Sequence, residues 1–269
     1  MGVNSPPNAK PDSIFYKLRK PTRSFDLIGS PSRNAARCCR RRPPGLKSTS
    51  IRRESFTDNP MRQGAKRMSI QIDADGIRQL FPEVDQIQDQ RLRDGVVEIW
   101  LEVAAETAWE RFEDIPKNLT LEKHMTLTGH IQGVIRMALA MADIAEDLHG
   151  IAVDRDLLIA SCLLHDISKP LECEADPGGP PGGGSALPAK KTEFGEKIQH
   201  GVYGAHKIWE KNLPKATELV HLVITHTRAS NTRSASYEAS LLFYADWGDS
   251  DAGIVMGGGK PFGARWVEG

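Results

Sequence analysis

Four residues that commonly bind metal ions lie within apolar, helix-like stretches of this sequence. His130 occurs in Thr-Gly-His-Ile-Gln-Gly-Val, and the pair His165-Asp166 follows the apolar run Leu-Ile-Ala-Ser-Cys-Leu-Leu. Asp246 stands late in another such run, Leu-Leu-Phe-Tyr-Ala-Asp-Trp. Because burying polar groups without partners is costly, we expect the four side chains to share a divalent cation. Imidazole and carboxylate ligands together suit Mn, Fe, Ni, Zn or Mg.

Helices are the elements that must position these residues. Apolar residues recur at three- to four-residue spacing, which is typical of amphipathic helices, from Gly95 until Pro116 breaks the pattern. Trp100 and Trp109 are expected in the core, and Asp154 is the expected N-cap of a later helix. The other predicted helices cover residues 127–148, 154–165, 194–211, 215–226 and 236–248. Alternating strand patterns are scarce, so the sequence predicts an all-α fold.

The same patterns divide the chain into segments. Residues 176–188 are dominated by Gly and Pro, which predicts a flexible surface loop. We expect the wider segment 172–193 to border the mouth of the site, where it could act as a lid. The predicted segments are a basic arm at 1–67, a helical segment packing on the core at 68–125, the metal-binding domain at 126–255 and a Gly-rich tail at 256–269.

The basic arm differs in composition from the rest of the chain. It holds 16 Lys/Arg against 4 Asp/Glu, whereas the remainder holds 19 against 31. Such a Ser-, Pro- and Arg-rich segment cannot bury enough apolar surface to fold, so disorder is expected. Its run Arg-Cys-Cys-Arg-Arg-Arg could contact nucleic acid or an anionic surface, and the composition also resembles a transit peptide. Because Met68 begins an ordinary-looking sequence, we favour an arm without function or an over-long gene start.

The cysteines and the hydropathy argue against a secreted or membrane-spanning protein. The four cysteines form neither a disulfide framework nor a CxxC metal motif, and Cys162 is expected to be a buried thiol. We therefore expect a reducing, cytoplasmic setting. The sequence has no run of 18 apolar residues and no hydrophobic signal-peptide core near Met1.

The order and spacing of the first four residues resemble the HD superfamily of metal-dependent phosphohydrolases. His130 precedes His165 by 35 residues, and Asp246 follows Asp166 by 80. The most specific piece is Leu-Leu-His-Asp-Ile-Ser-Lys-Pro, and the matching stretch runs from about residue 127 to residue 251. The resemblance implies an HD-domain helical bundle and a phosphohydrolase of class EC 3.1 or 3.6. It also implies a small phosphorylated substrate, such as a nucleotide.

Two further histidines extend the resemblance to the binuclear branch of the superfamily. His200 in Gln-His-Gly-Val-Tyr-Gly-Ala-His and His226 in Val-Ile-Thr-His-Thr complete the order H…HD…H…H…D. That branch includes cyclic-di-GMP phosphodiesterases of the HD-GYP kind and symmetrical diadenosine tetraphosphatases of the YqeK kind, and the local sequence is closer to the latter. The resemblance implies that Asp166 bridges two metals and that His200 and His226 hold the second. Alternatively, one of these histidines only hydrogen-bonds the substrate or a ligand carboxylate.

Three cations near the motif are candidate phosphate contacts. Lys169, three residues after Asp166, could hold a phosphate oxygen and offset charge in the transition state. Arg228 and Arg233 follow His226 and could grip further phosphates. These expectations together describe hydrolysis by a metal-activated water, with Asp166 and Lys169 as the catalytic residues.

Two other functions are compatible with the same ligand set. Some HD relatives hold two irons and activate dioxygen, so an HD-type di-iron oxygenase is one alternative. A non-catalytic, nucleotide-sensing module with a structural metal is the other.

The remaining histidines and the acids after Asp246 are expected outside the metal site. His206 does not share a helical face with His200 and is expected at the surface or on the substrate side. Asp249 and Asp251 are expected to form a solvated helix end. The histidines expected to be structural or exposed are His124, His149 and His221.

Overall fold

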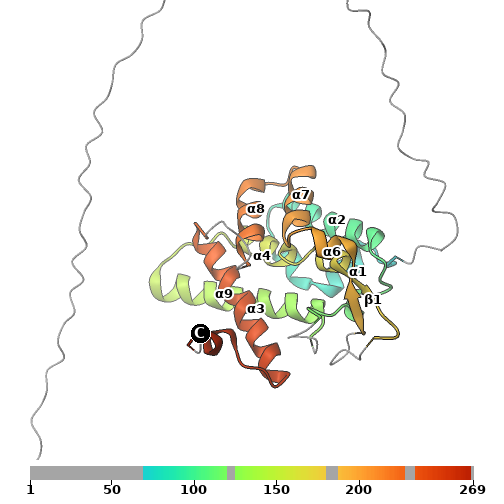
Figure 1. Cartoon of the computed structure of the whole chain (residues 1–269). Coiled ribbons are helices and arrows are strands. Elements are labelled where there is room, and N and C mark those ends of the chain that lie inside the picture. Colours follow the sequence, from blue (N-terminus) through green and yellow to red (C-terminus); the bar gives the residue numbers. More distant parts are fainter. Residues whose placement is uncertain (1–68, 120–124, 180–186, 228–233, 268–269) are drawn as a thin grey trace, which may run out of the picture. The chain divides into compact units, whose positions relative to one another are not determined.

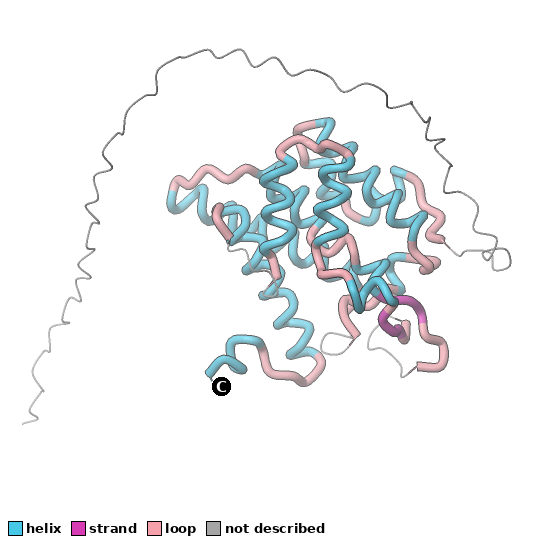
Figure 2. Tube along the Cα trace, turned by 45° about the horizontal axis from the view of Figure 1, so that its top comes forward, coloured by secondary structure: helices cyan, strands magenta, loops and turns pink. Residues whose placement is uncertain are grey.

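The computed structural model describes residues 69–119, 125–179, 187–227 and 234–267. The expected basic arm, the loop residues 180–186 and His124 lie outside the described residues, as do Arg228 and Arg233. Within the described ranges helices predominate, and the expected all-α class is confirmed (Figure 2). A small two-stranded sheet accompanies the helices.

The elements follow one another in the order labelled in Figure 1. The N-terminal part contains α1 (Ala74–Leu80), η2 (Pro82–Gln86), α2 (Gln90–Glu106) and η3 (Phe112–Asp114). The central part contains α3 (Leu127–His149), α4 (Arg155–Leu164), α5 (Lys169–Glu172), β1 (Cys173–Ala175) and β2 (Ala189–Lys191). The C-terminal part contains α6 (Glu193–Lys197), α7 (Val202–Glu210), α8 (Ala216–Thr225), α9 (Tyr237–Met256) and α10 (Phe262–Val267).

The two helices that begin the metal motif have well-formed ends. The hydroxyl of Thr126 accepts a hydrogen bond from the backbone of Gly129 at the start of α3, and Gly150 ends this helix in the left-handed region with φ 63°. Asp154 caps α4 by accepting from the backbone of Leu157, as the sequence predicts. These caps satisfy backbone groups that a helix end would otherwise leave without partners.

Helix α4 lies in the middle of the core. Residues 157–164 are all buried, because α4 contacts α2, α3, α8 and α9. A helix that is apolar all round is stable only inside a protein. Trp100 of α2 is fully buried against Phe81 and Phe112, and its indole nitrogen donates to the carbonyl of Leu163 at 3.2 Å. The N-terminal helices therefore pack on the helix that carries the motif.

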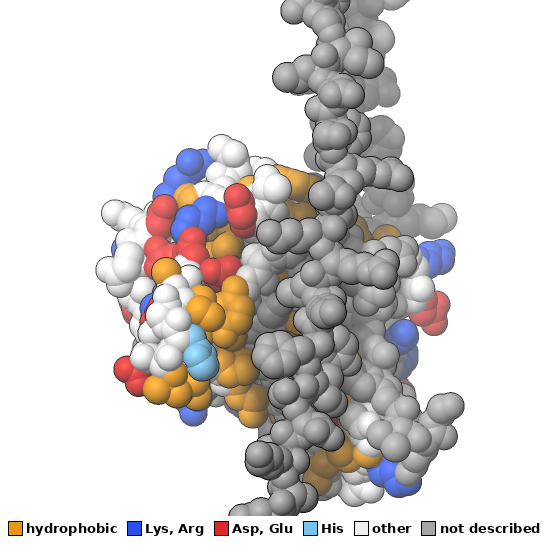
Figure 3. Space-filling model, turned by 90° about the vertical axis from the view of Figure 1, so that its left-hand side faces the viewer, with side chains coloured by type: hydrophobic (Ala, Val, Ile, Leu, Met, Phe, Trp, Pro, Cys, Tyr) orange, Lys and Arg blue, Asp and Glu red, His pale blue; other side chains and the backbone are white. Residues whose placement is uncertain are grey.

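Helices α3 and α9 cross beside α4 and contact each other extensively (Figure 1). Their inner sides are buried, but apolar side chains also reach the surface: Ile144 and Leu148 of α3 and Tyr244 of α9 are exposed. Figure 3 shows a face on which hydrophobic side chains are exposed next to a group of acidic ones. The division into an apolar and a polar side is thus incomplete along these helices.

The structure corrects three expectations about elements. The helix expected over 194–211 is interrupted between α6 and α7, because Ile198 is extended and Gly201 has φ 89°. The helix expected over 236–248 continues to Met256 as α9, and α10 follows within the Gly-rich tail. Strands β1 and β2 pair antiparallel, Cys173 with Lys191, and so flank the expected Gly/Pro-rich loop. None of the helices within the described ranges combines the length and apolar character needed to cross a membrane.

Candidate metal centre

All six expected metal ligands come together, although they arise from elements far apart in the sequence. One lies in the first turn of α3, two lie where α4 ends, one lies in the turn before α7, one ends α8, and one lies in the middle of α9. Helix packing alone brings them to one place. In chain order the residues are His130, His165, Asp166, His200, His226 and Asp246.

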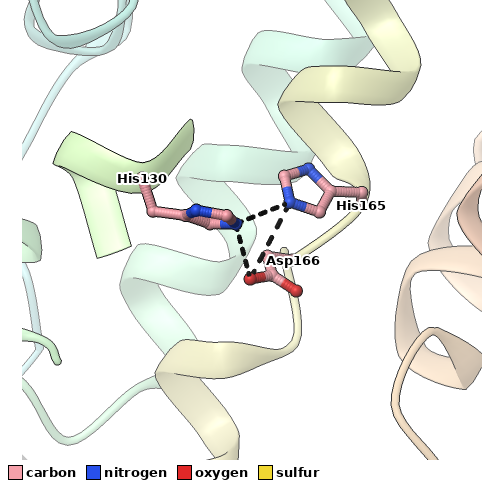
Figure 4. Close-up of side chains that lie close together, drawn as sticks. All are labelled: His130, His165 and Asp166. Atoms are coloured by element: carbon pink, nitrogen blue, oxygen red, sulfur yellow. Dashed lines mark hydrogen bonds and ion pairs between the residues drawn. The ribbon is translucent and has the colours of Figure 1, made fainter. Parts of the chain in front are cut away.

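The first group consists of His130, His165 and Asp166 (Figure 4), and Asp246 lies beside it. The Nε2 atoms of His130 and His165 are 3.2 Å apart. The Oδ2 atom of Asp166 lies 3.6 Å from Nε2 of His130 and 3.8 Å from Nε2 of His165. The Oδ1 atom of Asp246 lies 3.1 Å from Nε2 of His130. Both imidazoles are fully buried.

The second group shares Asp166 with the first and adds His200 and His226. The Oδ1 atom of Asp166 lies 2.5 Å from Nε2 of His200 and 3.7 Å from Nε2 of His226. One carboxylate therefore turns its two oxygens towards two different pairs of imidazoles.

The Nδ1 atom of each imidazole faces an oxygen. For His130 it is the Oδ2 atom of Asp249 at 2.7 Å, and for His165 it is the carbonyl of Cys162 at 2.7 Å. For His200 it is the Oε1 atom of Glu172 at 2.6 Å, and for His226 it is the carbonyl of Val223 at 2.5 Å. Oxygens in these places keep the proton of a neutral imidazole on Nδ1, which leaves the Nε2 lone pair free to accept.

The donor set therefore fits divalent cations. Four Nε2 lone pairs and the oxygens of two carboxylates face one another in a buried space, and in the neutral tautomers none of these nitrogens can donate to another. Buried lone pairs and carboxylate oxygens that face one another are stable only when a positive charge lies between them. Metal-binding histidines usually donate their other ring nitrogen to a carboxylate or carbonyl, and all four histidines are placed to do so here.

The pKa values of His165 and Asp166 agree with this interpretation. Burial lowers the pKa of His165 to about 3, so this imidazole is neutral and available as a ligand at neutral pH. Burial alone would raise the pKa of Asp166, but the nearby His165 and His200 hold it well below its usual range. The carboxylate shared by both groups is therefore ionised. Burial lowers the pKa of His130 and His200, but the carboxylates that face them raise both above the ordinary value, so a proton favours the same positions that a cation would occupy.

Asp249 is closer to the site than the sequence suggested. It was expected at a solvated helix end, but it is buried and its carboxylate holds Nδ1 of His130. Gly133 makes room for it, because a Cβ at that position would lie 2.0 Å from Oδ1 of Asp249. Asp249 lies three residues after Asp246, on the same side of α9, and this spacing was the signal available in the sequence.

Glu172 and Lys117 are two further residues that sequence reasoning missed. Glu172 holds His200 and also accepts from the hydroxyl of Ser168 at 2.6 Å. Lys117 is buried, donates to Ser250, and places Nζ 3.8 Å from Oδ1 of Asp246. No local pattern marks either residue, because Lys117 lies in the segment after η3 and Glu172 ends the short helix α5, and the whole fold decides where both lie.

Lys169, expected as a phosphate contact, lies at the edge of the cluster. Its Nζ is 3.4 Å from Oε2 of Glu172. Burial disfavours the ammonium, but the carboxylates of Asp166 and Glu172 raise the pKa of Lys169 above its ordinary value. Lys169 therefore keeps its positive charge at neutral pH, beside the second group.

The three other histidines within the described ranges lie away from the cluster, as expected. His206 is exposed and 3.7 Å from Glu210, and His149 is exposed at the end of α3. The Nε2 atom of His221 accepts from the backbone of Ala235 at 2.9 Å, which is a structural role. Trp109, like Trp100, is a core residue.

Comparison with known proteins places this cluster in a wider context. The family model described as HD domain matches residues 129–251, a region that contains all six residues of the cluster. A dihydroneopterin 2',3'-cyclic phosphate phosphodiesterase of Methanocaldococcus jannaschii is 28% identical over 186 residues, which make up 65% of this chain and 69% of the relative. No solved structure matches the chain.

Proposed function

We propose that this chain, whose residues 129–251 match the HD domain family model, belongs to the HD superfamily of phosphohydrolases and is a phosphodiesterase with two divalent metals. His130, His165 and Asp246 would hold the first metal, and His200 and His226 the second. Asp166 would contact both.

The two oxygens of Asp166 carry this proposal. Oδ2 faces His130 and His165, whereas Oδ1 faces His200 and His226. A carboxylate in this position can bridge two cations, and the imidazoles on each side supply the nitrogen ligands. The alternative, in which His200 only hydrogen-bonds the carboxylate of Asp166 at 2.5 Å, predicts one metal per chain instead of two.

The chemistry follows from the types of group at the site. Divalent metals at these positions would polarise a phosphoryl group and lower the pKa of water enough for it to attack near neutral pH. Lys169 brings an ammonium to the edge of the second group, where it would offset charge that develops on a phosphate oxygen. Asp249 and Glu172 would fix the orientation of His130 and His200.

We propose a small phosphodiester, such as a cyclic phosphate of a nucleotide-like molecule, as the substrate. The archaeal relative is named for a 2',3'-cyclic phosphate, and this argues for a diester. Kinship with the diadenosine tetraphosphatases, expected from the local sequence, would predict an anhydride substrate instead, and it stays a prediction. The contacts expected of Arg228 and Arg233 also stay predictions.

Metal analysis followed by hydrolysis assays tests the proposal. Purified full-length protein should contain about two divalent metals per chain, and should hydrolyse bis(p-nitrophenyl) phosphate and a nucleoside 2',3'-cyclic phosphate. Chelation should abolish the activity, and adding the metal back should restore it. Turnover that persists without dioxygen excludes the oxygenase alternative. Metal-loaded protein that binds nucleotides without hydrolysing any of these esters would favour the sensing module.

A further inference from the structure

A cavity of about 330 Å³ lies between the loop after η3 and the β1–β2 hairpin. Three lysines line it, Lys117, Lys169 and Lys191, together with Glu172 and Cys173. The volume is within the range of small-molecule sites, roughly 300–1,000 Å³.

Two of the three lysines that line the cavity also lie close to the metal centre, Lys117 beside the first group and Lys169 beside the second. Lys117 lies 3.8 Å from Asp246 of the first group. Lys169 lies 3.4 Å from Glu172, whose other oxygen holds His200 of the second group. A molecule in the cavity is therefore next to both groups.

The backbone holds Lys117 in this place. Its amide donates to the carbonyl of Met125 at 2.9 Å, and the amide of Leu127 donates to the carbonyl of Ile115 at 2.8 Å. These bonds fix the lysine beside the first turn of α3, which also carries His130. The fold therefore holds Lys117 in place beside the metal centre.

The hairpin supplies the third lysine at the outer part of the cavity. Lys191 of β2 pairs with Cys173 of β1, and both line the cavity. Lys190, the preceding residue, points to the other side of the strand, where its ammonium pairs with Glu174 at 3.4 Å. Within the described ranges, no carboxylate forms an ion pair with Lys191.

The charge of the cavity is positive. Its one carboxylate, Glu172, is already engaged by Ser168, Lys169 and His200. Three lysines around a small volume favour a phosphate-sized anion. Lys117 and Lys169 are close enough to the metal groups to serve the reacting phosphate, whereas Lys191 lies on the hairpin, paired with Cys173.

We propose that Lys191 selects substrates that carry a second phosphate, apart from the one that is hydrolysed. This inference rests on the proposed function for the identity of the reacting group, but its binding part does not. The substrate would place its diester at the metal centre and its second phosphate in the lysine-lined cavity.

Calorimetric titration of the purified, metal-loaded full chain with inorganic pyrophosphate tests the binding part without any turnover. We expect Lys191→Met to weaken binding roughly tenfold, because one charge-assisted contact is lost. Lys191→Arg should retain most of the affinity. Lys190→Met, on the other side of the same strand, should bind as the parent does. Equal affinities of the parent and Lys191→Met, or an equal loss in Lys190→Met, would overturn the inference.

Selectivity is then measured with two esters that differ by one group. The parent should hydrolyse a nucleoside 2',3'-cyclic phosphate with a 5'-phosphate at a higher kcat/KM than the same compound without it. Lys191→Met should lose this preference and keep its rate on bis(p-nitrophenyl) phosphate. A parent without preference contradicts the proposed selectivity. A parent that hydrolyses neither ester contradicts the proposed function, while the pyrophosphate titration still decides whether Lys191 binds phosphate.

Discussion

The first and second groups, which form the two halves of the metal centre, orient their imidazoles in the same way but lie on different kinds of elements. In each half, one imidazole is held by a carboxylate and the other by a backbone carbonyl three residues earlier in the chain. Asp249 and the carbonyl of Cys162 serve the first half, and Glu172 and the carbonyl of Val223 serve the second.

The halves differ in the elements that carry them. The first half lies on the long helices α3 and α9 and on the buried helix α4, and its imidazoles are fully buried. In the second half, His200 lies in the turn between α6 and α7, and its side chain is 17% exposed. Long packed helices fix a ligand more firmly than a short turn does. We therefore expect the first half to bind its metal tightly and the second to exchange its metal more readily.

Removing the shared carboxylate should have the largest effect, because it disables both halves. We expect Asp166→Ala to lower hydrolysis by roughly 10³-fold or more, since metal stabilisation is worth several kcal/mol. Metal content should fall in both halves, measured by elemental analysis. Asp147→Ala, at an exposed position of α3, is the control and should behave as the parent. An Asp166→Ala protein with full metal content would contradict the shared role.

Replacing one imidazole in each half tests the difference directly. His130→Ala should lose the first metal and also stability, about 1–3 kcal/mol, because the buried carboxylate of Asp249 loses its partner. His200→Ala should lose the second metal with a smaller change in stability, because its site is partly exposed. Urea unfolding and elemental analysis measure the two effects. Equal loss of stability in both variants would show that the halves are equally rigid.

The outer carboxylates should have a smaller effect, each confined to its own half. Asp249→Asn should lower the affinity for the first metal roughly 10- to 100-fold. Glu172→Gln should lower the affinity for the second metal by a similar factor. Gly133→Ala should resemble Asp249→Asn, because its Cβ would collide with Oδ1 of Asp249. Competition with a chelator measures both affinities. If Asp249→Asn released the second metal instead, the assignment of the halves would be wrong.

The smallest expected effect comes from Ser168, which only supports Glu172. Its hydroxyl donates to Oε1 of Glu172 at 2.6 Å. Loss of one such bond costs about 1 kcal/mol, or roughly a fivefold change in affinity. Ser168→Ala should therefore weaken binding of the second metal by about this factor and change binding of the first metal less. A larger change at the first metal than at the second would show that Ser168 does not act through Glu172.

The sequence predicts the ligands better than it predicts their surroundings. His130, His165-Asp166 and Asp246 were recognisable because polar residues interrupt apolar helical patterns, and α3 and α4 begin and end close to the expected residues. Asp249 was missed because three acids near a helix end resemble a solvated terminus. Only the close approach of α9 to Gly133 shows that this carboxylate is inside.

The other differences between the prediction and the structure arise where tertiary contacts determine the course of the backbone. The break between α6 and α7 depends on the positive φ of Gly201, and apolar spacing does not report it. The position of Lys117 depends on a backbone hydrogen bond to Met125, which lies eight residues later in the chain. Propensity is local, whereas these features are set by segments that meet after folding.

Sharing Asp166 between two sets of imidazoles has a thermodynamic consequence. On the proposed assignment, both cations draw on one negative charge, so occupancy of one position reduces the electrostatic attraction felt at the other. The two binding equilibria are then linked, and by reciprocity each ion weakens the other by the same factor. Loading should be anticooperative, which would let the metal supply set the fraction of chains that carry a complete pair.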